Sequence, residues 1–253
     1  MMLLYALHAQ AASMPIQPFD RWVLASQDFG CQVSRPYSAD GTIQLGIEAP
    51  LNSTPILLLA APNKWLPSGI GETRVIVDEG DPIDLHFGTF PLAVPGIRLI
   101  KLFPDANDWQ RLAHTKSLAL GPRMPPLALS GVVAAQKAVG DCAANLLASW
   151  GGNPELYRRG KLATVTGKFA AAFNRDTYPR EALARKITGR IILLLTTLAD
   201  GSVSECRVVS SANVALDEET CRIAQRQRLN APVNDQGQPM ASIAAVKVDW
   251  IMY

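Results

Sequence analysis

The sequence predicts an α+β protein: a mostly-β N-terminal domain that ends in a helix, followed by a small C-terminal domain with the order strand, strand, helix, strand. Two observations predict this fold class. Between residues 13 and 150, short runs of β-branched and aliphatic residues recur roughly every 8–12 residues, with turn signals between them. In residues 178–253, two apolar runs flank the turn signal Asp200-Gly201, and a stretch of helical pattern and a last apolar run follow.

The expected strands of the N-terminal domain are short and lie between turns such as Asp40-Gly41 and Pro95-Gly96. This spacing is typical of a β-sandwich or a barrel. The strands are expected at residues 31–33, 42–47, 56–59, 74–77, 83–87 and 97–100.

A helix is expected at the end of this domain. Ser130 is a suitable N-cap, because its hydroxyl can accept a hydrogen bond from a free backbone N–H of the first turn. Gly151-Gly152 ends the helix. Between them, apolar residues recur at helical spacing: Val132, Val133, Val139, Cys142, Ala143, Leu146, Leu147 and Trp150.

Residues 151–177 differ from both neighbours in charge. They carry five Lys and Arg against two Asp and Glu, whereas the whole chain has a formal net charge of +2. The stretch opens with Gly151-Gly152-Asn153-Pro154, and its large apolar residues are scattered. We interpret it as a basic linker whose charges are solvated.

Composition excludes several classes of protein. The chain is 48% hydrophobic and 18% charged, which is ordinary for a globular protein and excludes disorder of the whole chain. Its even charge balance argues against a nucleic-acid binder and against a polybasic membrane binder, each of which requires a lopsided basic surface. No uninterrupted apolar run of about 20 residues occurs, so no transmembrane helix is expected.

The N-terminus is a candidate export signal. Residues 3–7 are apolar, and Ala9-Gln10-Ala11 places small residues where a signal peptidase reads them. No Lys or Arg precedes the run, and the run is short. Residues 1–12 are therefore either a weak or truncated signal peptide or an N-terminal tail.

No catalytic constellation and no cofactor motif stands out. Ser, His and Asp occur in no nucleophile-elbow frame, and three histidines far apart in sequence do not suggest a metal site. An acidic cluster, Asp78, Glu79, Asp81 and Asp84, lacks the spacing of an EF-hand loop and is interpreted as a solvated turn. We expect a protein that is not an enzyme. An enzyme housed in residues 13–150, built around this cluster and His86, is the weaker alternative.

The C-terminal elements follow one another closely. Asp200-Gly201 is a strong hairpin signal, because glycine tolerates a positive φ. Asp217 is the expected N-cap of a helix that runs to about Arg228. The strands are expected at residues 187–198, 203–210 and 241–253.

Short motifs occur in a fixed order along this C-terminal stretch. They are Tyr178-Pro179 with Ala182, Ile187-x-Gly189, Asp200-Gly201, Val203, Val208, Ser210-Ser211, Leu216-Asp217, Arg228-Leu229, Pro232, Gly237-x-Pro239 and Val246-x-Val248-x-Trp250. In this order the segment 178–253 resembles the C-terminal domain of TonB-type energy transducers. The resemblance covers under a third of the chain.

Two features depart from that family's pattern. Its transducers carry an N-terminal membrane helix and a Pro-rich span across the periplasm, and neither occurs in this sequence. Residues 174–177 stand where the family has a Gln-rich segment, near the place where transducers engage receptor peptides.

These features lead us to expect a periplasmic or otherwise exported, non-catalytic protein that binds another envelope protein. An outer-membrane receptor or a second copy of the chain is the candidate partner. The alternative is a component of TonB-dependent energy transduction and transport across the outer membrane, acting with a separate membrane-anchored partner.

The four cysteines allow three pairings, and none lies in Cys-x-x-Cys spacing. Cys206 shares a strand face with Val208, and Cys221 shares a small apolar helix side with Ala224. A Cys206–Cys221 bridge would therefore join helix to sheet, and it would indicate an oxidising compartment. Cys31 and Cys142 are then either a second pair or two free buried thiols.

The run from Ile191 to Leu195 is apolar on both faces of its strand. A sheet with one face in water should alternate, so we expect the face of Ile192 and Leu194 to be covered as well. The cover is the N-terminal domain, a second copy or a bound partner; a partly exposed, strand-rich segment is the alternative. Ile192 and Leu194, with Tyr178 and Trp250 of the TonB-like motifs, are the candidate binding residues.

Overall fold

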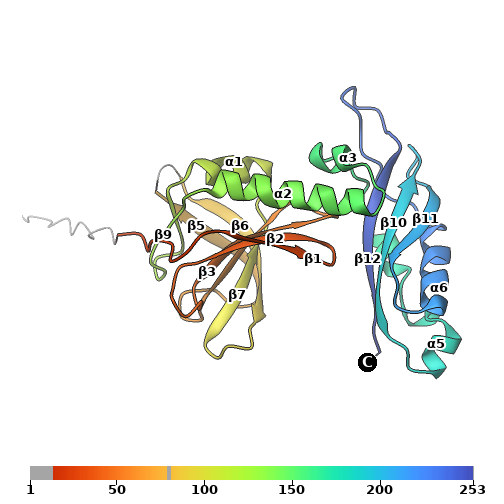
Figure 1. The fold of residues 1–253 in the computed structure, drawn as a ribbon, viewed down its shortest axis with the longest axis horizontal. Helices are drawn as coiled ribbons and strands as arrows, with labels where there is room; N and C mark the ends of the chain where they lie inside the picture. The colour runs from red at the N-terminus through yellow and green to blue at the C-terminus, as the bar shows by residue number, and fades with distance from the viewer. Residues whose placement is uncertain (1–13, 79–80, 253) are drawn as a thin grey trace, which may run out of the picture. The chain divides into compact units, whose positions relative to one another are not determined.

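The computed structural model describes residues 14–78 and 81–252. The candidate export signal at residues 1–12 and Glu79 of the acidic cluster lie outside the described residues. The described chain has the expected α+β class, with a large sheet and a small sheet accompanied by helices (Figure 1). Within the described residues, no helix combines the length and apolarity needed to cross a membrane.

The elements follow one another in this order: β1 (Val23–Gln27), β2 (Gly30–Pro36), β3 (Gln44–Pro50), β4 (Ile56–Pro62), β5 (Ile70–Val77), β6 (Ile83–Pro91), β7 (Ile97–Leu102), α1 (Ala106–His114), β8 (Ser117–Leu120), β9 (Leu127–Ala128), α2 (Val132–Ser149), α3 (Pro154–Arg158), α4 (Gly167–Ala171), the 3-10 helix η1 (Arg175–Thr177), α5 (Arg180–Ala184), β10 (Gly189–Thr197), β11 (Val203–Ser210), α6 (Val214–Ala224) and β12 (Ser242–Trp250).

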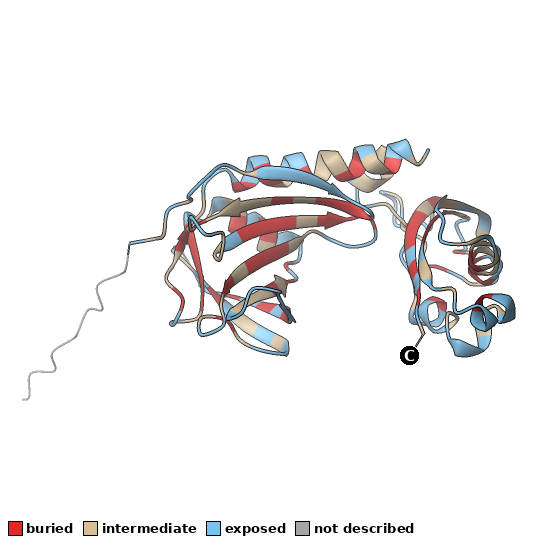
Figure 2. Cartoon of the chain, turned by 60° about the horizontal axis from the view of Figure 1, so that its bottom comes forward, coloured by how far each residue is buried: buried red, intermediate tan, exposed pale blue. Residues whose placement is uncertain are grey.

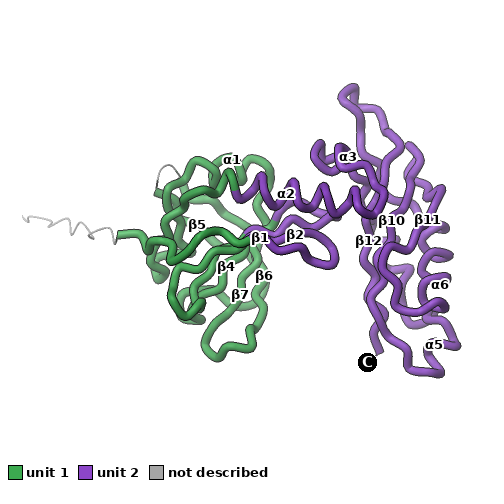
Figure 3. Tube along the Cα trace, viewed as in Figure 1, with its two compact units in different colours: residues 1–23, 34–46, 56–134 green, residues 24–33, 47–55, 135–253 purple. Residues whose placement is uncertain are grey.

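Two compact units make up the chain (Figure 3). One contains residues 34–46 and 56–134 together with the described residues before Leu24. The other contains residues 24–33 and 47–55 together with the chain from Ala135 onward. The second unit therefore includes segments from well before residue 150, where the sequence suggested a domain boundary.

The strands of the N-terminal half form one nine-stranded sheet, in the order β1-β2-β3-β4-β7-β6-β5-β8-β9. This is one open sheet, so the expectation of a sandwich or barrel is wrong. Strands β5, β6 and β7 pair antiparallel with their neighbours in the chain. Buried residues concentrate along the strands (Figure 2), and the largest include Leu45, Ile47, Leu59, Ile83, Leu85, Ile100 and Leu102.

Helix α2 is fastened to β2. Its buried side chains lie mainly at every fourth position, Ala135, Val139, Ala143 and Leu147, which places them on one face. Cys142 of this helix forms a disulfide with Cys31 of β2, with the two Cα atoms 6.0 Å apart.

The C-terminal sheet has the order β11-β10-β12, and both pairings are antiparallel. Residues Ile191, Leu193 and Leu195 of β10 and Ala244, Val246 and Val248 of β12 point into one core together with Leu216 and Ile223 of α6. The strand, strand, helix, strand order expected from the sequence is therefore confirmed.

The expected start of the last helix is wrong. Helix α6 begins at Val214, where the Asn213 side chain accepts a hydrogen bond from the Ala215 N–H at 3.0 Å. Asp217 instead accepts hydrogen bonds from the Ser211 hydroxyl and the Ala212 N–H, which ties the preceding turn to the helix. Asn213 and Asp217 are both good N-cap residues. The end of the preceding strand β11 determines that Asn213 takes this position.

Residues 151–177 are not a simple linker. They contain α3, α4 and η1, and Ala163 and Phe169 are buried in the C-terminal core. The Phe169 ring lies 5.3 Å from that of Phe173, which lies 6.0 Å from that of Trp250. The scattered apolar residues of this stretch supply rings that cover one end of the sheet.

The second disulfide joins Cys206 of β11 to Cys221 of α6, with Cα atoms 5.6 Å apart. The expected pair and the pair that the sequence left open are therefore both present, and no cysteine is free among the described residues. The Cys206–Cys221 bond joins helix to sheet, as the sequence predicts.

The hairpin turn between β10 and β11 is clamped by the chain that follows α6. Gly201 has φ +81°, and its carbonyl accepts a hydrogen bond from the Leu229 N–H at 2.9 Å. Arg228 donates to both the backbone carbonyl and the carboxylate of Asp200. Asp200 also accepts hydrogen bonds from the hydroxyl and backbone N–H of Ser202.

We expect the Cys206→Ser/Cys221→Ser double variant to lose stability. The bond closes a separation of 15 residues, and the chain-entropy model assigns roughly 3 kcal/mol to a loop of about that length. Urea unfolding under non-reducing conditions measures the loss while Cys31–Cys142 stays intact. Peptide mapping of exported protein that finds both residues as free thiols would contradict the expected bond.

A matched pair of glycine variants tests the clamp. Gly237 has φ +77° with open space around it, so Gly237→Ala should cost only the left-handed strain of about 1–2 kcal/mol. At Gly201 an added Cβ would also overlap the Leu229 carbonyl oxygen. Thermal or urea unfolding should therefore show a larger loss for Gly201→Ala, by roughly 1–3 kcal/mol. Equal losses of unfolding free energy would mean that the contact between Gly201 and Leu229 accommodates the added Cβ without destabilising the fold.

Stability should fall in acid because of the same turn. Hydrogen bonds from the Ser202 hydroxyl and N–H, and then from Arg228, lower the pKa of Asp200 from 3.8 to about 2. A depressed folded-state pKa contributes stability above the unfolded-state value, and that contribution is lost as the pH falls through about 2. Asp200→Asn should flatten the fall in unfolding free energy across this window; an unchanged slope would contradict the assignment.

Candidate protein-binding site

Tyr178 and Trp250, two of the expected binding residues, lie inside the C-terminal core. They are 8% and 4% exposed, and their rings pack edge to face with centroids 4.9 Å apart. The Trp250 Nε1–H donates to the Thr220 hydroxyl at 2.8 Å, and the Tyr178 hydroxyl donates to the Ile187 carbonyl at 2.5 Å. Burial raises the pKa of Tyr178. Both residues thus fix the end of β12 against α5 and α6 and present no contact surface.

Ile192 and Leu194 face the other side of the sheet and are also buried, at 2% and 4% exposure. The chain itself supplies cover beside them. Lys247, the cross-strand neighbour of Ile192, places its Nζ atom 5.8 Å from the centroid of the Phe29 ring. The Phe29 ring in turn lies 6.3 Å from that of Trp150, just past the end of α2.

An ion-pair chain lies along the same face. Arg190 precedes Ile192 by two positions and therefore shares its side of the strand. Its guanidinium contacts Asp249 at 2.7 Å and Asp28, beside Phe29, at 3.7 Å. Of the three covers that the sequence left open, the structure shows residues from the N-terminal half of the same chain.

Strand β12 forms an edge of the C-terminal sheet. It pairs with β10 through nine successive residues without a register shift, whereas β11, the other edge, has two irregularities in its register. Bulges blunt a strand edge as a docking surface. The regular β12 edge is therefore the better template for another strand.

The backbone groups on this edge divide into a closed part and an open part. The Ile243 carbonyl accepts a hydrogen bond from the Ala163 N–H at 2.9 Å, so it points away from β10. Because the direction alternates along a strand, the N–H and C=O groups of Ala245, Lys247 and Asp249 point the same way. In the part of the chain that the structure describes, no other backbone segment pairs with these three residues.

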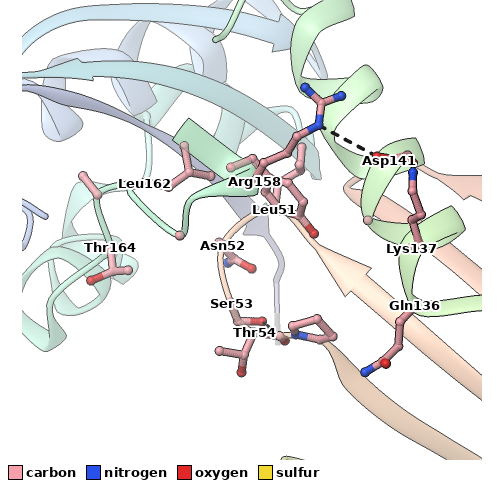
Figure 4. A pocket seen from close by; sticks show the side chains of 15 residues that line it. Leu51, Asn52, Ser53, Thr54, Gln136, Lys137, Asp141, Arg158, Leu162 and Thr164 are labelled. Carbon is pink, nitrogen blue, oxygen red and sulfur yellow. Dashed lines mark hydrogen bonds and ion pairs between the residues drawn. The ribbon is translucent and has the colours of Figure 1, made fainter. Parts of the chain in front are cut away.

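A cavity of about 510 Å³ lies where the closed part of the edge begins (Figure 4). It is lined by the loop 51–55, by α2 and by residues 157–164, which include Ala163. Its floor includes Leu51 and Leu162, and burial raises the pKa of the lining residue Tyr157 to about 12.

Charged side chains on the rim of this cavity neutralise one another. Asp141 contacts Lys137 at 2.5 Å and Arg158 at 3.8 Å, and Arg158 also pairs with Glu155. No histidine or cysteine is among the lining residues. The cavity can hold an apolar or amide-bearing side chain.

The acidic cluster of the sequence has a structural use. Asp78 accepts hydrogen bonds from the backbone N–H groups of Lys116 and Ser117, and Asp84 pairs with Arg74. His86 is exposed and lies 3.5 Å from Glu72. Among residues 14–78 and 81–252, no three His, Cys, Asp or Glu side chains are grouped to hold a metal ion.

Neither the open edge nor the cavity was predicted from the sequence. The edge has a weak signal in the sequence, because charged Lys247 and Asp249 alternate with Val246 and Val248 in the last strand. Charged side chains are common on the edge strands of sheets. The cavity has no such signal, since its walls come from three segments far apart in the chain.

Comparison with known proteins identifies the domain that carries this edge. No curated protein matches the chain. Residues 174–252 match the model of the family described as Gram-negative bacterial TonB protein C-terminal. The match begins at Asn174, within the stretch expected to be a linker, and it includes β10, β11, α6 and β12. The C-terminal part of the chain is therefore a TonB C-terminal domain, as the residues from Tyr178 to Trp250 suggested.

Proposed function

We propose that this chain is a non-catalytic cell-envelope protein whose TonB C-terminal domain binds a partner protein along β12. The family match at residues 174–252 supports a role in the envelope. Two disulfides fit a periplasmic or other exported location, because such bonds persist in oxidising compartments. The observation that carries the proposal is the open edge at Ala245, Lys247 and Asp249.

An extended segment of the partner adds to β12 as a further strand in this proposal. Main-chain hydrogen bonds supply the affinity in such complexes, and side-chain pockets supply the specificity. Each bond contributes about 0.5–1.5 kcal/mol net. The side chains of Lys247 and Asp249 are exposed beside the open groups and select charges on the incoming segment.

The β12 edge is preorganised before a partner binds. The disulfide Cys206–Cys221 and the Trp250–Thr220 hydrogen bond fix the sheet to α6. A rigid edge loses little conformational freedom on binding, so more of the interaction energy remains as affinity.

The second candidate function is a part in TonB-dependent energy transduction, together with a separate membrane-anchored component. The family match favours it. In that case the bound segment belongs to an outer-membrane receptor. In the broader proposal it belongs to another envelope protein or to a second copy of this chain.

Photo-crosslinking in intact cells tests the edge. A cross-linking residue at Ile251, which is 53% exposed and follows β12 directly, should yield an adduct that the same residue at Val214, 69% exposed, does not. Lys247→Pro removes an outward N–H without breaking the β10 ladder and should abolish most of the adduct. Lys247→Ala keeps that N–H and is the matched control.

Mass spectrometry then identifies the partner. A synthetic peptide of the cross-linked segment should bind Lys247→Pro roughly fivefold to tenfold more weakly than Lys247→Ala. If the adduct contains an outer-membrane receptor, the transduction role is supported. If the adduct is a dimer of this chain, self-association is supported. Equal adduct yields from both variants, with both folded by circular dichroism, would exclude β12 as the binding edge.

A further inference from the structure

Three segments of the N-terminal half meet at one end of the large sheet. They are the loop 63–69 between β4 and β5, the start of β5, and the turn 92–96 between β6 and β7. The Asn63 N–H donates to the Gly96 carbonyl at 2.8 Å, and the Thr89 N–H donates to the Gly69 carbonyl at 3.0 Å. We call this group of segments the β6–β7 tip.

The β6–β7 tip is built as a rigid feature. Arg98 donates to the Pro67 carbonyl at 2.8 Å and to the Leu66 carbonyl at 3.3 Å, which holds the loop against β7. The Thr89 hydroxyl accepts a hydrogen bond from the Gly69 N–H and donates one to the Gly69 carbonyl. The same carbonyl also accepts a hydrogen bond from the Thr89 N–H. A hollow of about 330 Å³ lies among the same residues.

Large apolar side chains project from this rigid frame. Phe90, Leu92 and Val94 are 46%, 39% and 52% exposed, and Ile70, paired opposite Gly88, is 93% exposed. Single exposed apolar residues are normal on protein surfaces. A contiguous group on one turn marks a place where the protein meets an apolar phase or another protein.

Basic residues outnumber acidic ones in the segments of the tip, where Glu72 of β5 is the acidic residue nearest in sequence to Ile70. Residues 62–71 and 89–104 contain Lys64, Arg98 and Lys101, and neither range contains an Asp or a Glu. The Lys101 ammonium lies 5.9 Å from the centroid of the Phe90 ring. Trp65, half-buried in the same loop, has the amphipathic ring that is enriched where membrane meets water.

We propose that the β6–β7 tip docks on the surface of a bilayer that contains anionic lipid. Phe90, Leu92 and Val94 enter the boundary between headgroups and acyl chains, and Lys64 and Lys101 contact lipid phosphates. Apolar tips with a basic rim bind membranes through this combination of burial and attraction. A strand-adding protein partner fits less well, because the exposed turn carries Pro91 and Pro95, which have no N–H to donate.

Vesicle flotation with the full chain tests the proposal. The protein should float with phosphatidylcholine vesicles that contain phosphatidylglycerol, and much less with phosphatidylcholine alone. Phe90→Ser/Leu92→Ser/Val94→Ser should lower the partition coefficient at least tenfold. The matched control, Val133→Ser/Leu198→Ser/Val214→Ser, replaces side chains that are 58%, 51% and 69% exposed outside the tip and should bind like wild type.

Charge-reversal variants and added salt test the electrostatic part of the proposal. Lys64→Glu/Lys101→Glu should lower binding roughly tenfold or more, and added salt should weaken the wild type. Circular dichroism of every variant shows that it is folded. Absence of binding to anionic vesicles overturns the proposal, as does equal binding by the tip variant and its control. Ultracentrifugation of the tip variant tests a second copy of the chain as the occupant. If the wild type does not bind vesicles and the tip variant loses self-association, the tip is an interface between two copies.

Discussion

Strand β10 is buried on both faces, and the C-terminal part of the chain is arranged around it. Ile191, Leu193 and Leu195 lie in the core beneath α6, while Ile192 and Leu194 point the other way and are equally buried. A three-stranded sheet has little stability alone and requires cover on its apolar faces. Helix α6 covers one face, and on the other the centroid of the Phe29 ring lies 5.8 Å from the Nζ atom of Lys247, the cross-strand neighbour of Ile192. In the proposed function, the sheet therefore meets a partner through its edge.

The start of that edge is set by a segment upstream of the family match. Besides the bond from Ala163 to Ile243, Thr164 pairs with Asn230 in an isolated bridge. The Ser242 hydroxyl donates to the Lys161 carbonyl at 2.5 Å. These contacts close β12 up to Ile243, so an added strand can begin only at Ala245. The fold of this domain therefore extends to about Lys161, although the match begins at Asn174.

Local chemistry made much of the C-terminal fold predictable, and non-local packing explains the errors. The Asp200-Gly201 turn and the Cys206–Cys221 bond depend on residues close in sequence, and both are present. The linker was misjudged because Phe169 is buried in a core whose other members, such as Trp250, lie far along the chain.

The binding residues were misjudged for a related reason. A motif shows that Tyr178 and Trp250 matter, but it does not distinguish a core aromatic from a contact surface. An open edge consists of backbone groups, which every residue carries. Only the strand order shows that those of Ala245 and Lys247 lie without a neighbouring strand.

The two disulfides act at different distances along the chain. Cys206–Cys221 spans 15 residues within one domain, whereas Cys31–Cys142 spans 111. In the chain-entropy model, a loop of about 100 residues is worth roughly 4.7 kcal/mol, so the longer bond restrains the unfolded chain more. It joins β2 to α2, whose ends carry Phe29 and Trp150. The Phe29 ring lies beside Lys247, the cross-strand neighbour of Ile192, so the longer bond fastens residues next to that face of the sheet.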